Sequence, residues 1–176
     1  MTAVEPMWSI RVSRHVEAPA AVVWQVVTDL EGMAGLLPDI VRLERLSDDG
    51  PGTYRRGTRW RETRRMFGRE ATETMEVTAV DPERRTDIVA EHGGVRYDTG
   101  FDLTPAGNGA EPGGTDLVFR FDATQVGEPA TGVKGLAERV GMTVMGPLAM
   151  RVTRKQMERE LSLIAQRAGN LAAGGG

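Results

Sequence analysis

Acidic, basic and aromatic side chains share a face on two neighbouring strands predicted in the middle of the chain. Alternation puts Trp60, Glu62 and Arg64 on one face of the first strand, and Glu73 and Met75 on one face of the second. Because Trp60 and Met75 are apolar, we expect both faces to point inward. This places Glu62, Arg64 and Glu73 in, or at the mouth of, an apolar cavity.

Two interpretations of these polar groups are open. Glu62, Arg64 and Glu73 could form a salt-bridge cluster at the rim of the cavity. Alternatively, a carboxylate without a partner would have its pKa raised by desolvation, which is how a general acid or base is made. On that hypothesis Glu62, Arg64 and Tyr97 are the candidates for proton transfer.

Two later strands carry aromatic residues on a single face, Tyr97 and Phe101 on one and Phe119 and Phe121 on the other. We expect these side chains to face the long C-terminal helix, either as ordinary core or as the wall of a ligand cavity. Tyr97 stands out because its hydroxyl needs a hydrogen-bond partner if it is buried.

Methionines recur along the C-terminal helix at Met142, Met145 and Met150. Flexible thioethers line adaptable apolar pockets well, and they also fill ordinary cores. The candidate ligand-binding residues are therefore Trp60, Glu73, Met75, Tyr97, Phe101, Phe119, Phe121, Met142, Met145 and Met150.

The elements that must position these residues follow from hydrophobic periodicity and turn signals. In chain order we expect a strand at 8–16, a helix opening at Ala18-Pro19, a short helix at 33–37, strands at 40–46, 54–66, 71–80, 88–91, 95–103 and 116–123, and a long helix ending near 168. Pro147 should kink or interrupt that last helix. Short turns favour antiparallel pairing, and a sheet with one apolar face must bury it. The expected fold is α+β, a curved antiparallel sheet of about six to seven strands wrapped around the C-terminal helix.

Length and composition exclude several classes of protein. The 176 residues suit one domain, expected at 1–170 with a disordered tail at 171–176. With no cysteine and two histidines, neither disulfides nor a histidine-rich metal site is expected, and no cofactor is predicted. The apolar runs fall short of the roughly 20 residues of a membrane span. The N-terminus lacks the pattern of a secretory signal, so the cytoplasm is the expected location.

A stretch from 55 to 69 carries seven arginines, although the net charge of the whole chain is −3. Glutamates on the facing strand can pair with this stripe, and no aromatic residues interleave with it for base stacking. We therefore expect a solvated sheet face and no nucleic-acid binding. Binding of an acidic partner or of an anionic lipid surface is the alternative for this face. A homodimer is a separate alternative for the whole chain.

The opening Val16-Glu17-Ala18-Pro19-Ala20-Ala21-Val22-Val23-Trp24 resembles the signature start of the START-like superfamily, including its polyketide cyclase/dehydrase group. Leu37-Pro38-Asp39-Ile40 and Gly57-Thr58-Arg59-Trp60 resemble later elements in the same order, over about residues 8–168. The resemblance implies the helix-grip fold.

The resemblance also implies a range of functions, because one fold hosts many. The first expectation is binding of a hydrophobic small molecule, such as a polyketide, lipid or aromatic metabolite, between sheet and helix. The alternatives are a polyketide cyclase or aromatase acting on a poly-β-keto chain, and a protein-interaction module.

Overall fold

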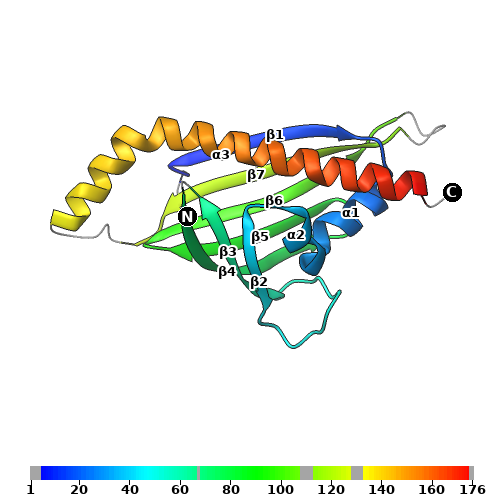
Figure 1. Ribbon diagram of the computed structural model, residues 1–176, viewed down its shortest axis with the longest axis horizontal. Coiled ribbons are helices and arrows are strands. Elements are labelled where there is room, and N and C mark those ends of the chain that lie inside the picture. The colour runs from blue at the N-terminus through cyan, green and yellow to red at the C-terminus, as the bar shows by residue number, and fades with distance from the viewer. Residues whose placement is uncertain (1–4, 67, 108–112, 128–132, 175–176) are drawn as a thin grey trace.

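The structure, a computed structural model, describes residues 5–66, 68–107, 113–127 and 133–174, with side chains given outside residues 66 and 133–145. Seven antiparallel strands form one curved sheet in the order β1-β7-β6-β5-β4-β3-β2 (Figure 1). The strands are β1 (Trp8–Val16), β2 (Ile40–Arg45), β3 (Arg59–Met66), β4 (Arg69–Asp81), β5 (Arg85–His92), β6 (Val95–Pro105) and β7 (Thr115–Gln125). With the long helix α3 (Val133–Gly174) lying along β1, this confirms the predicted helix-grip fold.

The hairpin between β5 and β6 shows how the sequence sets the register. Gly93 and Gly94 have φ values of 58° and 78°, which residues with a Cβ rarely adopt. His92 therefore pairs with Val95, and Ala90 with Tyr97. This register brings Tyr97 to the inward face of β6, one strand away from β4, because Ala90 of β5 pairs with Tyr97 on one side and with Met75 of β4 on the other.

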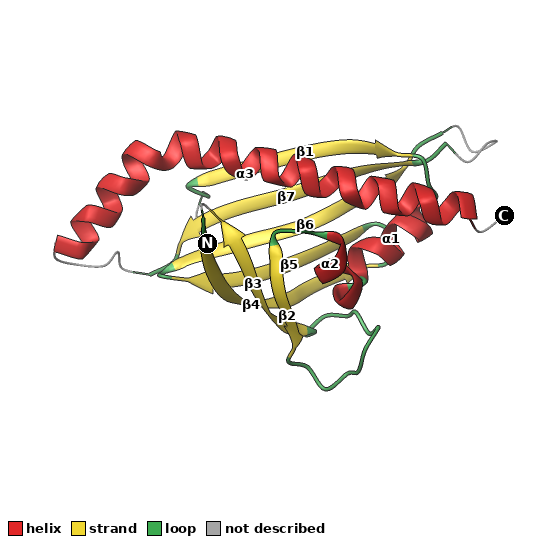
Figure 2. Ribbon diagram, in the orientation of Figure 1, coloured by secondary structure: helices red, strands yellow, loops and turns green. Residues whose placement is uncertain are grey.

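Two short helices, α1 (Ala20–Thr28) and α2 (Leu30–Leu36), lie at one end of the sheet near the C-terminal part of α3 (Figure 2). The second helix was predicted to begin at Met33, but it begins at Leu30. Asp29 explains the difference, because its Oδ1 accepts a hydrogen bond from the Gly32 amide at 2.9 Å and caps α2.

The third strand starts later than predicted, at Arg59 instead of residue 54. The preceding residues form a loop held by Asp49, whose carboxylate accepts hydrogen bonds from Ser47 Oγ at 2.6 Å and Thr58 Oγ1 at 2.8 Å. Tyr54 lies in this loop and its hydroxyl contacts Thr86 Oγ1 at 2.7 Å.

The long helix contains Pro147 and changes direction in its yellow-to-orange part (Figure 1), as predicted for a proline inside a helix. At the same place Gly146 lies against the Trp8 ring, so that an added Cβ would sit 3.5 Å from Cζ2. The helix then continues to Gly174, past the end expected near 168. Leu171 and Ala172, expected in a disordered tail, are helical and lie against the core.

Two groups of buried residues hold the described part of the chain together. The larger joins β1, β6, β7, α1 and α3, and includes Ile10, Val23, Leu117, Leu161 and Ile164. The smaller comprises Leu30, Trp60, Val77 and Ile88. The apolar face of α3 thus packs on the β1 side of the sheet, which leaves the β3–β4 side available for a cavity.

Candidate functional site

A cavity of about 210 Å³ lies between the inward face of the sheet and α3. Strands β3, β4, β6 and β7 form one side, and α3 forms the other. The lining residues are Glu62, Arg64, Ala71, Glu73, Met75, Tyr97, Thr99, Phe119, Phe121, Thr153, Gln156, Met157 and Glu160. The wall is mainly apolar, with its charged groups gathered on β3, β4 and α3.

Most of the residues predicted from the strand pattern lie in this wall. Seven of them line the cavity: Glu62, Arg64, Glu73, Met75, Tyr97, Phe119 and Phe121. Strict alternation explains this result, because residues two apart on a strand point to the same face. Whether any of them binds a ligand stays a prediction.

Three other predicted ligand-binding residues do not line the cavity. Trp60 is buried, only 3% exposed, and Phe101 is buried behind the wall, where its ring stacks on Phe119 at a centroid distance of 4.6 Å. Met150 packs against the larger core group. The side chains of Met142 and Met145 lie outside the described residues.

Arg64 is the centre of a charged network that joins the sheet to α3. Its Nε donates to Glu62 Oε1, and its Nη1 lies 2.5 Å from Glu160 Oε1. Trp60 Nε1 donates to the other Glu62 oxygen at 3.0 Å, and Gln156 Nε2 donates to Glu160 Oε1 at 3.2 Å. Burial alone would lower the pKa of Arg64, but Glu160 and Glu62 together raise it above its usual value. Arg64 therefore stays charged.

The salt-bridge cluster predicted from Glu62, Arg64 and Glu73 is wrong in one residue, because Glu160 takes the place of Glu73. Within the described residues, Arg64 forms its ion pairs with Glu62 and Glu160, and Glu73 is not one of its partners. Glu160 is missing from the sequence prediction, although a signal was present. It follows Met157 by three residues and precedes Ile164 by four, which places it on the apolar face of the helix. A carboxylate on the buried face of a helix needs a cation as its partner, because an unpaired buried charge is costly.

Glu73 and Tyr97 are the polar residues of the cavity best suited to act as a general base and a general acid. Burial raises the pKa of Glu73, with His92 acting against the shift and Glu62 adding to it. Burial, reinforced by the charge of Glu73, also raises the pKa of Tyr97. The Tyr97 ring lies beside that of Phe121 at a centroid distance of 5.9 Å. An acid that is easily protonated thus lies near a phenol on an aromatic wall.

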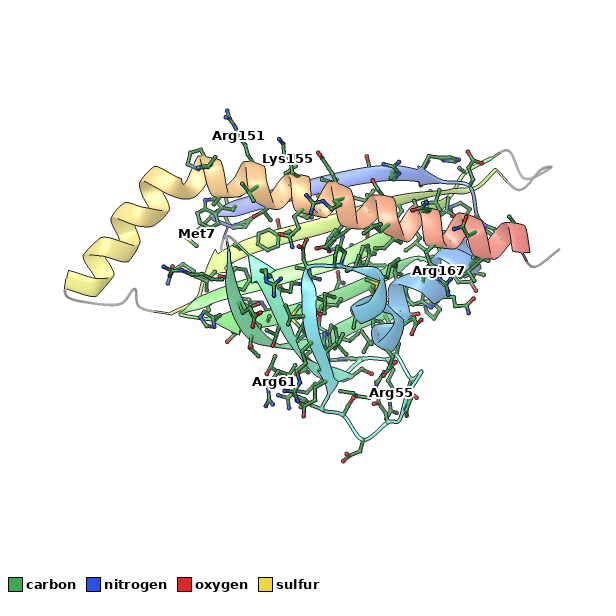
Figure 3. The ribbon with its side chains drawn as sticks, viewed as in Figure 1. Met7, Arg55, Arg61, Arg151, Lys155 and Arg167 are labelled. Carbon is green, nitrogen blue, oxygen red and sulfur yellow. The ribbon has the colours of Figure 1, made fainter. Side chains whose placement is uncertain are left out.

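Two arginines of the convex face pair with glutamates of β4 as the sequence predicted, and a third, Arg61, pairs with a glutamate of β2 instead. Arg59 contacts Glu76 at 3.6 Å, Arg61 contacts Glu44 at 3.5 Å, and Arg65 contacts Glu70 at 3.1 Å. Figure 3 shows Arg61 on the far side of the sheet from α3. Exposed pairs of this kind contribute little to stability, and they reduce the charge offered to a partner.

Metal-binding and membrane-spanning features are absent from the described residues. No three His, Asp or Glu side chains there are grouped so that they could hold a metal ion. Within the same part of the chain, no helix is both long enough and apolar enough to cross a membrane.

Solved structures with the same fold include proteins of several kinds. A Thermus thermophilus protein is 22% identical over 94% of this chain and 99% of its own, with a TM-score of 0.71. The Zhui aromatase/cyclase from Streptomyces is 20% identical over 92% of this chain and 93% of its own, with a TM-score of 0.68. A START superfamily protein from Mycobacterium smegmatis is 16% identical over 94% of this chain and 97% of its own, with a TM-score of 0.60.

Comparison with curated proteins gives no match. The family model described as "Polyketide cyclase / dehydrase and lipid transport" matches residues 7–169, which is nearly the whole chain. The chain therefore belongs to the polyketide cyclase/dehydrase and lipid transport family.

Proposed function

We propose that this protein binds a compact, largely apolar small molecule in the cavity between the sheet and α3. The observation that carries the proposal is the cavity wall, in which Met75, Phe119, Phe121 and Met157 surround a few convergent polar groups. Ligand sites are typically concave, mostly apolar and fixed by a small number of polar contacts.

The size of the cavity narrows the class of ligand. Its volume of about 210 Å³ is below the roughly 300–1,000 Å³ of common ligand pockets. A molecule of one or two rings suits this space better than a long acyl chain. Aromatic rings on β6 and β7 offer such a molecule a face to stack against.

A cyclase or aromatase activity on a poly-β-keto chain is the second candidate, favoured by Glu73 and Tyr97. The similarity in fold to the Zhui aromatase/cyclase agrees with this candidate. Glu62 and Arg64, also predicted for proton transfer, are held in the network with Glu160. Glu73 is therefore the better candidate for the base and Tyr97 for the acid.

The binding proposal is tested by asking whether an apolar molecule is retained in the cavity. Purified protein is analysed by native mass spectrometry and then by denaturing extraction, and titrated with an environment-sensitive apolar dye. Thr99→Phe fills the cavity from the middle of β6, whereas Thr74→Phe places the same ring on the exposed face of β4.

We expect wild type and Thr74→Phe to bind the dye and Thr99→Phe to lose binding. Equal binding by all three proteins would place the dye elsewhere and contradict the proposal, as would an empty protein that binds no dye.

A further inference from the structure

The charges around the cavity do not balance. Its lining residues include three carboxylates, Glu62, Glu73 and Glu160, and one cation, Arg64. Arg151 and Lys155 on α3 point away from the sheet (Figure 3). Among the lining residues, one positive charge therefore faces three acidic groups.

The strand register makes this imbalance sharper. Glu62 on β3 is directly opposite Glu73 on β4, on the same inward face. Like charges that oppose each other across a strand pair are destabilising. Arg64 relieves this conflict only in part, because its two ion pairs go to Glu62 and Glu160. Its charge and that of His92 act against the raised pKa of Glu73, but burial still raises that pKa above its usual value. The carboxylate of Glu73 is therefore not neutralised by an ion pair with Arg64, and a cationic group of a ligand can lie beside it.

The part of the sheet formed by β6 and β7 is suited to a positive charge as well. Tyr97, Phe119 and Phe121 line it with aromatic rings. The face of an aromatic ring attracts a cation within about 6 Å, and the attraction is stronger where water is excluded. Carboxylates on β3, β4 and α3 and aromatic rings on β6 and β7 can thus act on the same ligand group.

From this geometry, and resting on the proposed binding function, we infer that the cavity selects its ligand by charge. It takes a compact ring compound that carries a protonated amine, with the ammonium group beside Glu73 and the ring against Tyr97 and Phe121. A carboxylate of the same size is disfavoured, because it would lie among Glu62, Glu73 and Glu160 with Arg64 already paired to two of them.

The pH dependence of this selection follows from the groups around Glu73. They are Glu62 and Arg64 on β3, His92 at the end of β5 and Tyr97 on β6. Since burial raises the pKa of Glu73, the carboxylate becomes neutral at a higher pH than an ordinary glutamate. Preference for the ammonium ligand must therefore shrink as the pH falls through that value.

The test uses three naphthalene probes that differ only in one substituent: aminomethyl, hydroxymethyl or carboxylate. Their dissociation constants are measured by calorimetry at neutral pH on the full chain. We expect the amine to bind about tenfold more tightly than the alcohol, and the carboxylate about tenfold more weakly, each factor corresponding to about 1.4 kcal/mol. Glu73→Gln should remove most of the amine preference and leave binding of the alcohol nearly unchanged.

Glu70→Gln is the matched control, because Glu70 lies on the same strand but is exposed and contacts Arg65. It should keep the full preference for the amine. If Glu73→Gln does not fold, the pH dependence of the wild-type preference gives the same information. Thr99→Phe should abolish binding of all the probes that bind wild type.

The outcomes separate the two proposals. If the alcohol binds in the cavity but the amine binds no more tightly, the charge inference is overturned and the binding function stands. Equal effects of Glu70→Gln and Glu73→Gln on the amine preference would overturn the charge inference in the same way. If none of the three probes binds, the binding function itself fails.

Discussion

Replacing Arg64 with methionine should destabilise the fold far more than replacing its neighbour Arg65. Arg64→Met keeps most of the side-chain volume but leaves Glu62 and Glu160 without their cation, and their side chains are only 8% and 4% exposed. Breaking a buried ion pair costs about 3–5 kcal/mol, because the remaining charge is uncompensated. Hydrogen bonds from Trp60 and Gln156 remain, so we expect a loss of about 3 kcal/mol. For a chain of this size, that corresponds to a fall in Tm of roughly 6–12 °C.

Arg65→Met provides the comparison, because the side chains of Arg65 and Glu70 are 61% and 51% exposed. An exposed pair contributes about 0–1 kcal/mol. The free energy of unfolding is measured for both variants by urea denaturation, followed through tryptophan fluorescence. Equal losses in the two variants would refute the claim that the buried network stabilises the junction of sheet and helix.

The pH dependence of the Arg64→Met effect has a defined sign. Burial raises the pKa of Glu160, a shift that Arg64 opposes in the wild type. A group whose folded-state pKa is raised opposes folding when ionised, and this penalty is lost as the pH falls toward the unfolded value of about 4.3. The difference between Arg64→Met and wild type should therefore shrink on acidification. A difference that stays constant or grows would assign the loss to packing.

Three further predictions follow from local contacts. Gly100→Ala should lower the free energy of unfolding by several kcal/mol, because an added Cβ would lie 2.1 Å from the Thr86 carbonyl oxygen. If urea denaturation shows normal stability, β5 and β6 can move apart easily and the prediction is wrong. Asp29→Ala should lower the free energy of unfolding by about 1 kcal/mol, because it removes the cap of α2. Asp29→Asn can still cap the helix and should keep most of that stability, so equal losses in the two variants would contradict the capping role. Tyr54 and Tyr97 are the two tyrosines of the chain, and burial raises the pKa of Tyr54 to about 12 and that of Tyr97 above its usual value. Ultraviolet titration should therefore show little tyrosinate near pH 10, the ordinary value, and normal titration there would count against burial of both rings.

The parts of the fold that the sequence predicts well are those where one local pattern decides the structure. The first strand, 8–16, has the predicted bounds because strict alternation leaves one choice of face. Gly93-Gly94 fixes its hairpin because only glycine adopts both turn conformations easily. The start of β3 was missed because the side chains that hold the loop around Asp49 are brought together only by the fold.

The candidate site follows the same rule. Alternation correctly placed Glu62, Arg64 and Glu73 on one inward surface, because they belong to adjacent strands with a short turn between them. The alternation pattern did not show which carboxylates would pair with Arg64. Glu160 is far away in sequence and reaches the site only when α3 docks on the sheet. Met150 was assigned to the cavity because methionines on the helix suit apolar pockets, but they suit the core equally, and Met150 packs against the core.

The sheet order has a consequence for how the chain folds. Strands β2 to β7 each pair with a neighbour in sequence, but β1 pairs only with β7, so that Trp8 lies opposite Ala123. During synthesis β1 emerges before the other strands and has no strand partner until β7, at Thr115–Gln125, has been made. Forming such long-range contacts is slow, because the loop-closure entropy must be overcome before the contacts stabilise the fold. We expect the β2–β7 meander to form first, with the docking of β1 and then of α3 as the late step that creates the cavity.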